Sequence, residues 1–329
     1  MRQVTTRRLF SHVSVAITLV LGFGSLAWAQ TYPNKPIRLV VPQAPGGGSD
    51  TIGRFIAQKL GDSLGQQVVV DNKPGAAGML GAEIVKQSPA DGYTLLLSAI
   101  DTITAPLVSR HPPFDGVKDF APVTQLAQSH NVWLVGPSFD GSTMKELVSK
   151  AKSNPNKIDF ASSGVGGMQH LAGAMLNKMA NVEIAHVPYK GGPPAFTDVV
   201  GGRVPVMVSG IQGALPQIKS GKVRALAVTG KKRTPVLPDV PTVGEALGLS
   251  DYEALNWQGL VFPVGTPASV VDRVASEVIK ILAQPETREK LAAMGYEPVG
   301  NTPAQFGSLM LEEQKRWGLI IKAANITAD

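Results

Sequence analysis

The chain has 329 residues, no cysteine and a formal net charge of +6. The absence of cysteine excludes disulfides, thiolate nucleophiles and cysteine-ligated metals. Three arginines, Arg2, Arg7 and Arg8, lie at the N-terminus, and without them 28 basic residues face 25 acidic ones. The remaining short basic run, Gly230 to Arg233, is typical of a solvated turn. We therefore expect a nearly neutral mature chain with no nucleic-acid partner.

The first 29 residues have the pattern of an export signal. A basic start precedes an apolar run from Val13 to Gly24, and Ala27 to Ala29 form a small-x-small cleavage site. The apolar run is shorter than the ~20 residues that span a bilayer, which argues against a membrane anchor. Thr6 to Phe10 resemble a twin-arginine signal, and export by the general secretory route stays equally open. We expect cleavage near Ala29 and a mature chain that starts at Gln30.

The first pattern in the mature chain is a strand, a glycine loop and a helix. An apolar run at Ile37 to Val41 predicts a buried strand, and Gly46 to Gly48 follow it. Helical spacing then connects the apolar residues Ile52, Phe55, Ile56, Leu60 and Leu64. Such a junction places a helix N-terminus where it binds anions. From the residues alone, the loop is either a site for a carboxylate or only a tight turn.

The same pattern of short strand, small-residue turn and helix recurs along the chain. It begins again near Gln67, Tyr93, Lys157, Ile184 and Val204. This alternation predicts open, mainly parallel sheets flanked by helices. Ligands in such folds bind beyond the carboxyl ends of the strands, where these loops lie.

Two long segments without helical period interrupt the alternation, at residues 119 to 138 and 233 to 267. A chain that enters a second lobe and returns needs two such crossings. We therefore predict a first lobe built from residues 31 to 130 and 252 to 329, and a second lobe built from residues 131 to 251. Pro267 and Pro303 predict the starts of two closing helices with core-facing apolar stripes.

Motifs for catalysis do not assemble. The glycine loop lacks the Gly-Lys-Ser/Thr of a phosphate loop, and Thr51 stands where a dinucleotide site needs its third glycine. No Gly-x-Ser-x-Gly turn occurs. The four histidines of the mature chain, His111, His130, His170 and His186, have no metal-ligand spacing. We expect no catalytic residue, no cofactor and no metal. His170 follows a glycine loop and either lines a site or packs locally.

Taken in order, several segments resemble the Bug family of periplasmic solute receptors, the binding components of tripartite tricarboxylate transporters. They are "YPNKPIRLVVPQAPGGGSD", "DNKPGAAGMLGAEIVKQSPADGYTLLL", "FASSGVGGMQHLAGAML", "HVPYKGGPPAFTDVVGGRV", "GKVRALAVTGKKRTPVLPDVPTVGEA" and "GYEPVGNTPAQF". The resemblance covers the chain from about Tyr32 to the C-terminus. It implies a type II-like periplasmic binding protein with two α/β lobes. Such a receptor closes on a small carboxylate and delivers it to a membrane permease.

The resemblance also assigns binding loops to this chain. In the first lobe they are Pro45, Gly46, Gly47, Gly48, Ser49, Asp50 and Ser98; in the second they are Ser163, Gly164, Gly166, Gly167, His170, Tyr189, Lys190 and Gly191. Two departures stand out. Gly167 replaces a frequent Ser or Thr, and Val208 to Ala214 lack an aspartate that many relatives carry. The second departure argues against a ligand whose amine needs a carboxylate partner there.

Together with this resemblance, these observations predict a non-enzymatic, periplasmic receptor for a small carboxylate. We expect it to be a monomer that passes its ligand to the permease subunits of a tripartite transporter. The ligand carboxylate is expected at the N-terminus of the helix after Asp50, with the helix after Gly167 facing it. Two alternatives stay open. One is an exported hydrolase that uses Ser49 or Ser163, and the other is a sensor domain that presents its ligand state to a partner protein.

Overall fold

The computed structural model describes residues 32–328, so the predicted export signal lies outside the described residues. Every helix and strand described below belongs to one compact unit, Lys35–Asp329. No helix in residues 32–328 combines the length and the apolar character that a membrane span requires.

The first sheet has six strands in the order β11-β4-β10-β3-β1-β2. Their bounds are β1 Ile37–Val41, β2 Val68–Asn72, β3 Thr94–Ala99, β4 Phe120–Ser129, β10 Asn256–Pro263 and β11 Glu297–Pro298. Strand β1 pairs in parallel with β2 and β3, whereas β10 is antiparallel to β3 and to β4. The short β11 closes the edge beside β4 in antiparallel register.

The second sheet has five strands in the order β7-β6-β8-β5-β9. Their bounds are β5 Asn131–Val135, β6 Asp159–Ser162, β7 Ala185–Pro188, β8 Val206–Gly210 and β9 Arg224–Val228. Strand β6 pairs in parallel with β7 and β8, and β5 is antiparallel to β8 and to β9. The two sheets therefore repeat one plan, three parallel strands followed by one antiparallel strand and a further neighbour, to which the first sheet adds β11 at its edge.

The predicted two-lobed α/β architecture is confirmed, but each sheet is mixed rather than mainly parallel. Besides the two-residue β11, the antiparallel members are β5 and β10, and both of these lie in the long segments predicted as crossings. Strand β5 follows β4 of the other sheet with one residue between them. No crossover helix reverses the chain there, and β5 pairs antiparallel to β8.

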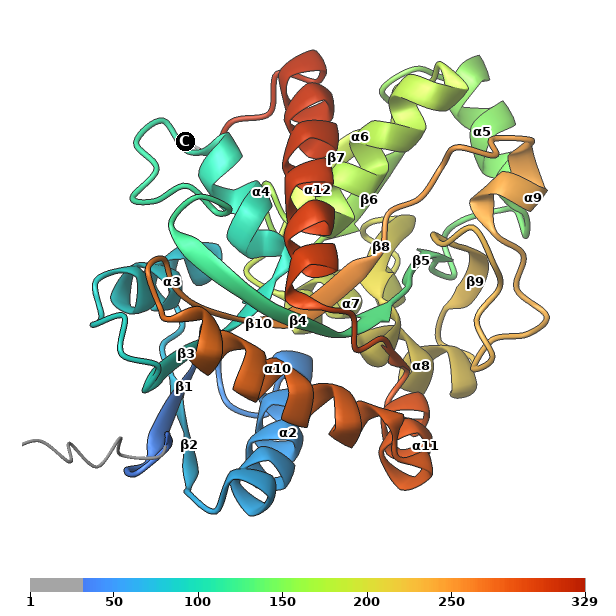
Figure 1. The fold of residues 1–329 in the computed structure, drawn as a ribbon. Helices are drawn as coiled ribbons and strands as arrows, with labels where there is room; N and C mark the ends of the chain where they lie inside the picture. Colours follow the sequence, from blue (N-terminus) through green and yellow to red (C-terminus); the bar gives the residue numbers. More distant parts are fainter. Residues whose placement is uncertain (1–31, 329) are drawn as a thin grey trace, which may run out of the picture. The chain divides into compact units, whose positions relative to one another are not determined.

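Helices flank both sheets, as Figure 1 shows. Their bounds are α2 Gly48–Leu64, η1 Ala76–Gly78, α3 Met79–Lys86, α4 Ile100–Val108, α5 Met144–Ser153, α6 Met168–Ala180, α7 Gly192–Val200, α8 Ile211–Lys219, α9 Val243–Leu247, α10 Ala268–Ala283, α11 Pro285–Ala293 and α12 Pro303–Ala323. Five of them, α2, α4, α6, α7 and α8, directly follow a parallel strand. Their N-termini therefore lie at the carboxyl ends of the strands.

The closing helices begin where the prolines predicted. Helix α10 starts after Pro267, and α12 starts at Pro303 with a capping box between Thr302 and Gln305. The predicted apolar stripes of both helices contribute buried residues, including Val274 of α10. Pro303 at the first helical position preorganises φ, and neither it nor Pro267, the N-cap of α10, costs a helical hydrogen bond, which explains why the sequence located these ends.

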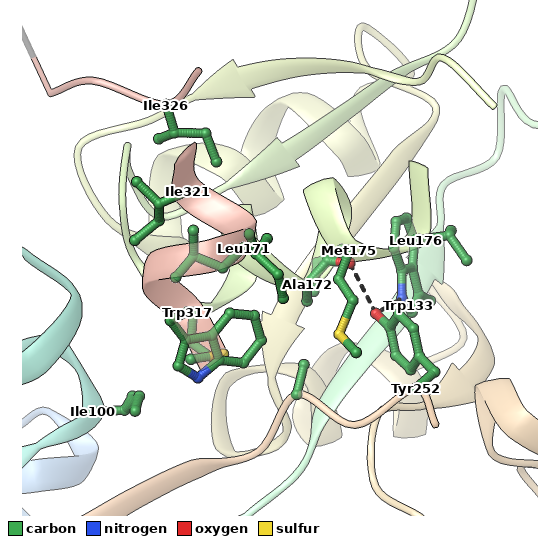
Figure 2. Packing of buried hydrophobic residues seen from close by; sticks show 14 of the residues in the cluster. Ile100, Trp133, Leu171, Ala172, Met175, Leu176, Tyr252, Trp317, Ile321 and Ile326 are labelled. Carbon is green, nitrogen blue, oxygen red and sulfur yellow. Dashed lines mark hydrogen bonds between the residues drawn. The ribbon is translucent and has the colours of Figure 1, made fainter. Parts of the chain in front are cut away.

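Helix α12 connects the main cluster of buried apolar residues at the first sheet with the helices of the second sheet. It packs against α4 and β4 and also against α6. Figure 2 shows Trp317 and Ile321 of α12 beside Leu171 of α6 within one cluster of buried apolar residues. In the same cluster, the Tyr252 hydroxyl accepts a hydrogen bond from Trp133 Nε1 at 3.1 Å and donates one to the Ala172 carbonyl at 2.9 Å.

Candidate functional site: a cavity at the helix N-termini

A cavity of about 850 Å³ lies where the carboxyl ends of the parallel strands of both sheets meet. First-turn or capping residues of five helices line it: Gly48 and Ser49 of α2, Ala99, Ile100 and Asp101 at α4, Gln169 of α6, Gly192 and Pro193 of α7, and Gly210, Gln212 and Gly213 at α8. The first N–H groups of a helix have no partner inside the helix, and the helix dipole is positive there. The convergence of these ends favours a bound anion.

The glycine loop contributes its backbone to this cavity. Gly47 is the N-cap of α2 and supplies no side-chain cap, and Gly48 and Ser49, which follow it, line the cavity. Gly46 has φ +83°, a conformation that favours glycine. A Cβ at Gly48 would lie 2.7 Å from Tyr296 Oη, so only glycine fits at that position without displacing the tyrosine. Pro45, Gly46 and Gly47 are not among the lining residues.

Asp50 shapes the loop from inside the protein. Its carboxylate accepts hydrogen bonds from Arg54 Nε at 3.0 Å, from the Gly46 N–H at 2.9 Å and from Asn72 Nδ2 at 2.8 Å. The bond from Arg54, together with those from Gly46 and Asn72, outweighs burial and lowers the pKa of Asp50 to about 2. Asp50 is therefore ionised, its carboxylate oxygens are hydrogen-bonded to these neighbours, and it does not line the cavity.

The second-lobe loop after β6 reaches the cavity through two side chains. Ser163 Oγ donates to Gln169 Oε1 at 2.9 Å, and both residues line the cavity. Gln169 Nε2 donates in turn to Asn131 Oδ1 at 3.1 Å. Gly166 has φ +76° and the position of its missing Cβ is filled by Val108 of α4. Gly164, Gly166 and Gly167 shape this turn but are not among the lining residues.

The remaining predicted loop residues lie beside the cavity rather than on its wall. Tyr189 donates its hydroxyl hydrogen to Asp198 at 2.8 Å, and Lys190 is exposed. Gly191 is the N-cap of α7, whose first residue Gly192 does line the cavity. Ser98 is fully buried at the end of β3, and its Oγ has no hydrogen-bond partner among the described residues.

His170 lies in a different environment from the one expected. Its ring stacks on His186 at a centroid distance of 3.7 Å, and both rings line a separate hollow of about 570 Å³ together with Ile320 and Ile326. Burial lowers the pKa of His170 to about 4 and that of His186 to about 3. The local-packing alternative considered for His170 agrees with this position.

Sequence reasoning missed Asp101, which lines the cavity from the first turn of α4. Its carboxylate accepts a hydrogen bond from the Met168 N–H at the start of α6, so it caps a helix that follows the other sheet. Burial raises the pKa of Asp101 to about 6, and the bond from Met168 opposes this rise. The one signal for it in the sequence is an acidic residue two positions after β3, and ordinary residues of a first helix turn share that signal.

The cavity wall also includes Gln43, Asn256, Gln258 and Tyr296, none of which was predicted as a binding residue. Asn256 and Gln258 lie on β10, which the sequence assigned only to a long crossing. Apolar side chains complete the wall: Ile100, Phe196, Val200, Met207, Val208 and Trp257. A ligand with both an anionic group and an apolar body fits such a surface.

The described residues do not assemble a hydrolytic site around the two predicted serines. Ser163 is bonded to the amide of Gln169, and Ser49 makes no hydrogen bond to a histidine among the described residues. Ser162 Oγ does lie 2.6 Å from His186 Nε2, but Ser162 is fully buried and also donates to the Gly164 carbonyl. Residues 32–328 contain no group of three His, Asp or Glu side chains that could hold a metal ion.

Two mixed α/β sheets with a cavity at their facing helix N-termini define a two-lobed binding protein. The periplasmic binding protein BugD superposes on this chain with a TM-score of 0.78 and 34% identity, covering 90% of this chain and 99% of BugD. A structure from R. palustris with adipate has a TM-score of 0.81 and 34% identity over 90% of this chain and 99% of that one.

Sequence comparison places the chain within one family of such proteins. The family described as "Tripartite tricarboxylate transporter family receptor" matches residues 52–326, and the chain belongs to it. The UPF0065 protein in the tcbD-tcbE intergenic region of Pseudomonas sp. (strain P51) is 38% identical over 326 residues, which cover 98% of this chain and 96% of that protein. The resemblance to Bug receptors is thereby confirmed.

Proposed function

We propose that this protein is an extracytoplasmic receptor that captures a small carboxylate in the 850 Å³ cavity. The observation that carries the proposal is the convergence of five helix N-termini on this one cavity. Gly48 and Ser49 of α2 are the proposed primary carboxylate ligands, through their backbone N–H groups. Each helix-terminal contact contributes about 0.3 to 1 kcal/mol, so several together give a useful affinity.

The related structure that contains adipate supports a carboxylate ligand. Of the other predicted loop residues, Ser163 is proposed to contact ligand directly, because it lines the cavity. Pro45, Gly46, Gly47, Asp50, Gly164, Gly166, Gly167 and Gly191 are proposed to set the loop geometry. Direct contacts of Ser98, His170, Tyr189 and Lys190 would require a rearrangement of the loops around them.

We propose the lobe boundaries predicted from the sequence, with residues 31–130 and 252–329 in the first lobe and 131–251 in the second. The strands support this division, since the first sheet takes its strands from residues 37–129 and 256–298 and the second from 131–228. Closure on the ligand would then turn about the crossings near His130 and Ala254, driven by contacts that only the closed form makes.

A thermal-shift screen tests the proposal directly. The protein is heated with a panel of mono-, di- and tricarboxylates, and each acid is paired with its uncharged amide as a control. A ligand at about 100 times its dissociation constant stabilises the folded protein by about 2.7 kcal/mol. Stabilisation by at least one acid and not by its amide supports the proposal. Stabilisation by the amides alone would overturn it.

The cellular part of the proposal is export to the periplasm with cleavage near Ala29, action as a monomer, and transfer of the ligand to permease subunits of a tripartite transporter. Membership of the receptor family supports the transport role. N-terminal sequencing of protein recovered from the periplasm tests the export step. The expected first residue is Gln30, and an exported chain that retains residues before Ala27 would contradict it.

A further inference from the structure

Asp101 gives the proposed site an acidic group that a simple anion site would not need. It lies in the first turn of α4 and lines the cavity. The Met168 N–H uses one of its acceptor positions. An ionised carboxylate offers about four such positions on its two oxygens. Capping α6 therefore leaves acceptor capacity on Asp101 beside the cavity.

A second acceptor on the wall has no partner. Gln258 lies on β10 directly opposite Ala99, the residue that precedes α4, and it also lines the cavity. Only 7% of its surface is exposed, and its Oε1 has no hydrogen-bond partner among the described residues. Leaving a buried amide oxygen unpaired is unfavourable, so a donor supplied by the ligand would stabilise the complex.

The charges on the wall restrict what that ligand can be. Among the described lining residues, the charged ones are Asp101 and Lys222, and Lys222 is exposed. An ionised carboxylate placed beside Asp101 would meet a like charge in a partly desolvated cavity, which is unfavourable. A hydroxyl or ammonium group at the same place would instead donate to Asp101 and to Gln258.

We infer that Asp101, together with Gln258, makes this receptor select monocarboxylates that carry a hydrogen-bond donor at the other end, hydroxy or amino acids, over diacids. This inference rests on the proposed function. The ligand carboxylate lies at the α2 N-terminus, and its donor end lies against Asp101 and Gln258. Asp101 thereby supplies the acidic partner that the segment Val208 to Ala214 lacks.

The test uses two matched series of probes that differ only at the far end. One series is hexanoate, 6-hydroxyhexanoate, 6-aminohexanoate and adipate, and the other is benzoate, 4-hydroxybenzoate, 4-aminomethylbenzoate and terephthalate. Calorimetry at neutral pH measures each with the wild type, Asp101→Asn and Gln258→Leu. Asp62→Asn is the control, because it removes one negative charge from an exposed position on α2 outside the cavity.

In the wild type and in Asp62→Asn, the hydroxy or amino acid of at least one series should bind about tenfold or more tightly than the diacid, as expected for a hydrogen bond to a charged group. Asp101→Asn should remove this preference or reverse it, since its amide can donate to a second carboxylate. Gln258→Leu should weaken the hydroxy or amino acid more than it weakens the simple monocarboxylate.

The outcomes separate the inference from the proposed function. A wild type that prefers the diacids, or an Asp101→Asn variant that keeps the donor preference, overturns the inference and leaves the receptor function intact. Failure of every acid in both series to bind the wild type counts against the carboxylate-receptor function itself. Circular dichroism confirms that each variant is folded before its affinities are compared.

Discussion

His170 and His186 form a parallel stack, with ring centroids 3.7 Å apart and 12° between the ring planes. His186 Nε2 lies 2.6 Å from Ser162 Oγ, and His170 Nδ1 accepts the Gly166 N–H at 3.2 Å. Burial lowers both pKa values, and the neighbouring His170 lowers that of His186 further. The folded protein therefore holds two neutral imidazoles, one on α6 and one on β7, beside the loop that follows β6.

This pair should make the protein less stable as the pH falls below about 6.5. Unfolding restores the ordinary pKa of about 6.5, so the unfolded chain binds protons that the folded chain does not. Stability then rises with pH between the folded and the unfolded pKa values. Each histidine should remove about 2 kcal/mol of unfolding free energy between about pH 7.5 and about pH 5. Urea unfolding at the two pH values measures this loss.

His186→Gln provides the matched comparison, because glutamine can reach Ser162 and does not titrate. The variant should lose about 2 kcal/mol less than the wild type between the two pH values. Asp101 acts in the opposite sense below about pH 6, since its raised pKa favours protonation in the folded state. Its effect cancels when wild type and variant are compared. Equal losses in both proteins would show that His186 is protonated in the folded state.

Substitutions in the glycine loop should separate Gly48 from Gly47. Gly48→Ala places a methyl group 2.7 Å from Tyr296 Oη and on the cavity wall, whereas a Cβ at Gly47 meets nothing closer than 3.4 Å. Gly47 has φ −75°, which any residue adopts. We expect Gly48→Ala to weaken carboxylate binding about tenfold or more and Gly47→Ala to change it less than about threefold. Calorimetry with one confirmed ligand decides between them.

Asn131 should stabilise the crossing between the lobes. Its Oδ1 accepts from Asn256 Nδ2 at 2.7 Å and from Gln169 Nε2 at 3.1 Å, and its Nδ2 donates to the Ala254 carbonyl at 2.8 Å. Asn131→Ala removes all three bonds, although the Ala254 carbonyl keeps the one from Thr229 Oγ1, and should lower the unfolding free energy by about 1 to 3 kcal/mol. Asn154→Ala, at an exposed helix end, is the control and should change it by less than about 0.5 kcal/mol.

The same variant tests whether the crossing acts as a hinge. Small-angle scattering should show a larger radius of gyration for ligand-free Asn131→Ala than for the wild type, since the bonds that hold Gln169 and Asn256 together are lost. Saturation with ligand should reduce the difference, because ligand contacts favour the closed form. If the variant is destabilised but its radius of gyration is unchanged, Asn131 contributes to the stability of the fold and not to closure of the lobes.

The sequence predicted the alternating βα units because each one carries its own local signals. Strand, glycine turn and helix are adjacent in the chain, and Pro267 and Pro303 mark helix starts without help from tertiary contacts. The antiparallel placement of β5 and β10 was not predictable in this way. It depends on which sheet the chain enters after a crossing, which is a property of packing rather than of local pattern.

The sequence predicted which loops reach the cavity, but not most of the side chains that line it. Gly48, Ser49 and Ser163 lie on the wall because the strand ends placed their loops there. Asp101 and Gln258 were missed because the first looks like an ordinary residue of an early helix turn and the second belongs to a long crossing. His170 was placed near the wall because it follows a glycine loop, but helix periodicity turns its ring toward His186.

Asp50 should determine the shape of the glycine loop, Gly46 to Gly48, without touching the ligand. Its carboxylate joins the Gly46 N–H, Arg54 and Asn72, and these bonds fix the turn that presents Gly48 and Ser49 to the cavity. Asp50→Ala should lower the unfolding free energy by about 1 to 3 kcal/mol, with Arg54 itself well solvated. Ligand affinity should fall about tenfold or more, because a disordered loop must be ordered on binding.

The pH dependence of the unfolding free energy is an independent test of the hydrogen bonds around Asp50. The pKa of Asp50 is lowered to about 2, so its stabilising contribution is complete above about pH 4 and disappears as the pH falls towards 2. The wild type should therefore approach the stability of Asp50→Ala in strong acid while exceeding it at neutral pH. Thr51→Ala, one residue further along the same helix turn, is the control and should keep wild-type affinity and acid response. If Asp50→Ala bound its ligand as tightly as the wild type, the loop would be shaped by its glycines alone, and the carboxylate would serve only to anchor Arg54 and Asn72.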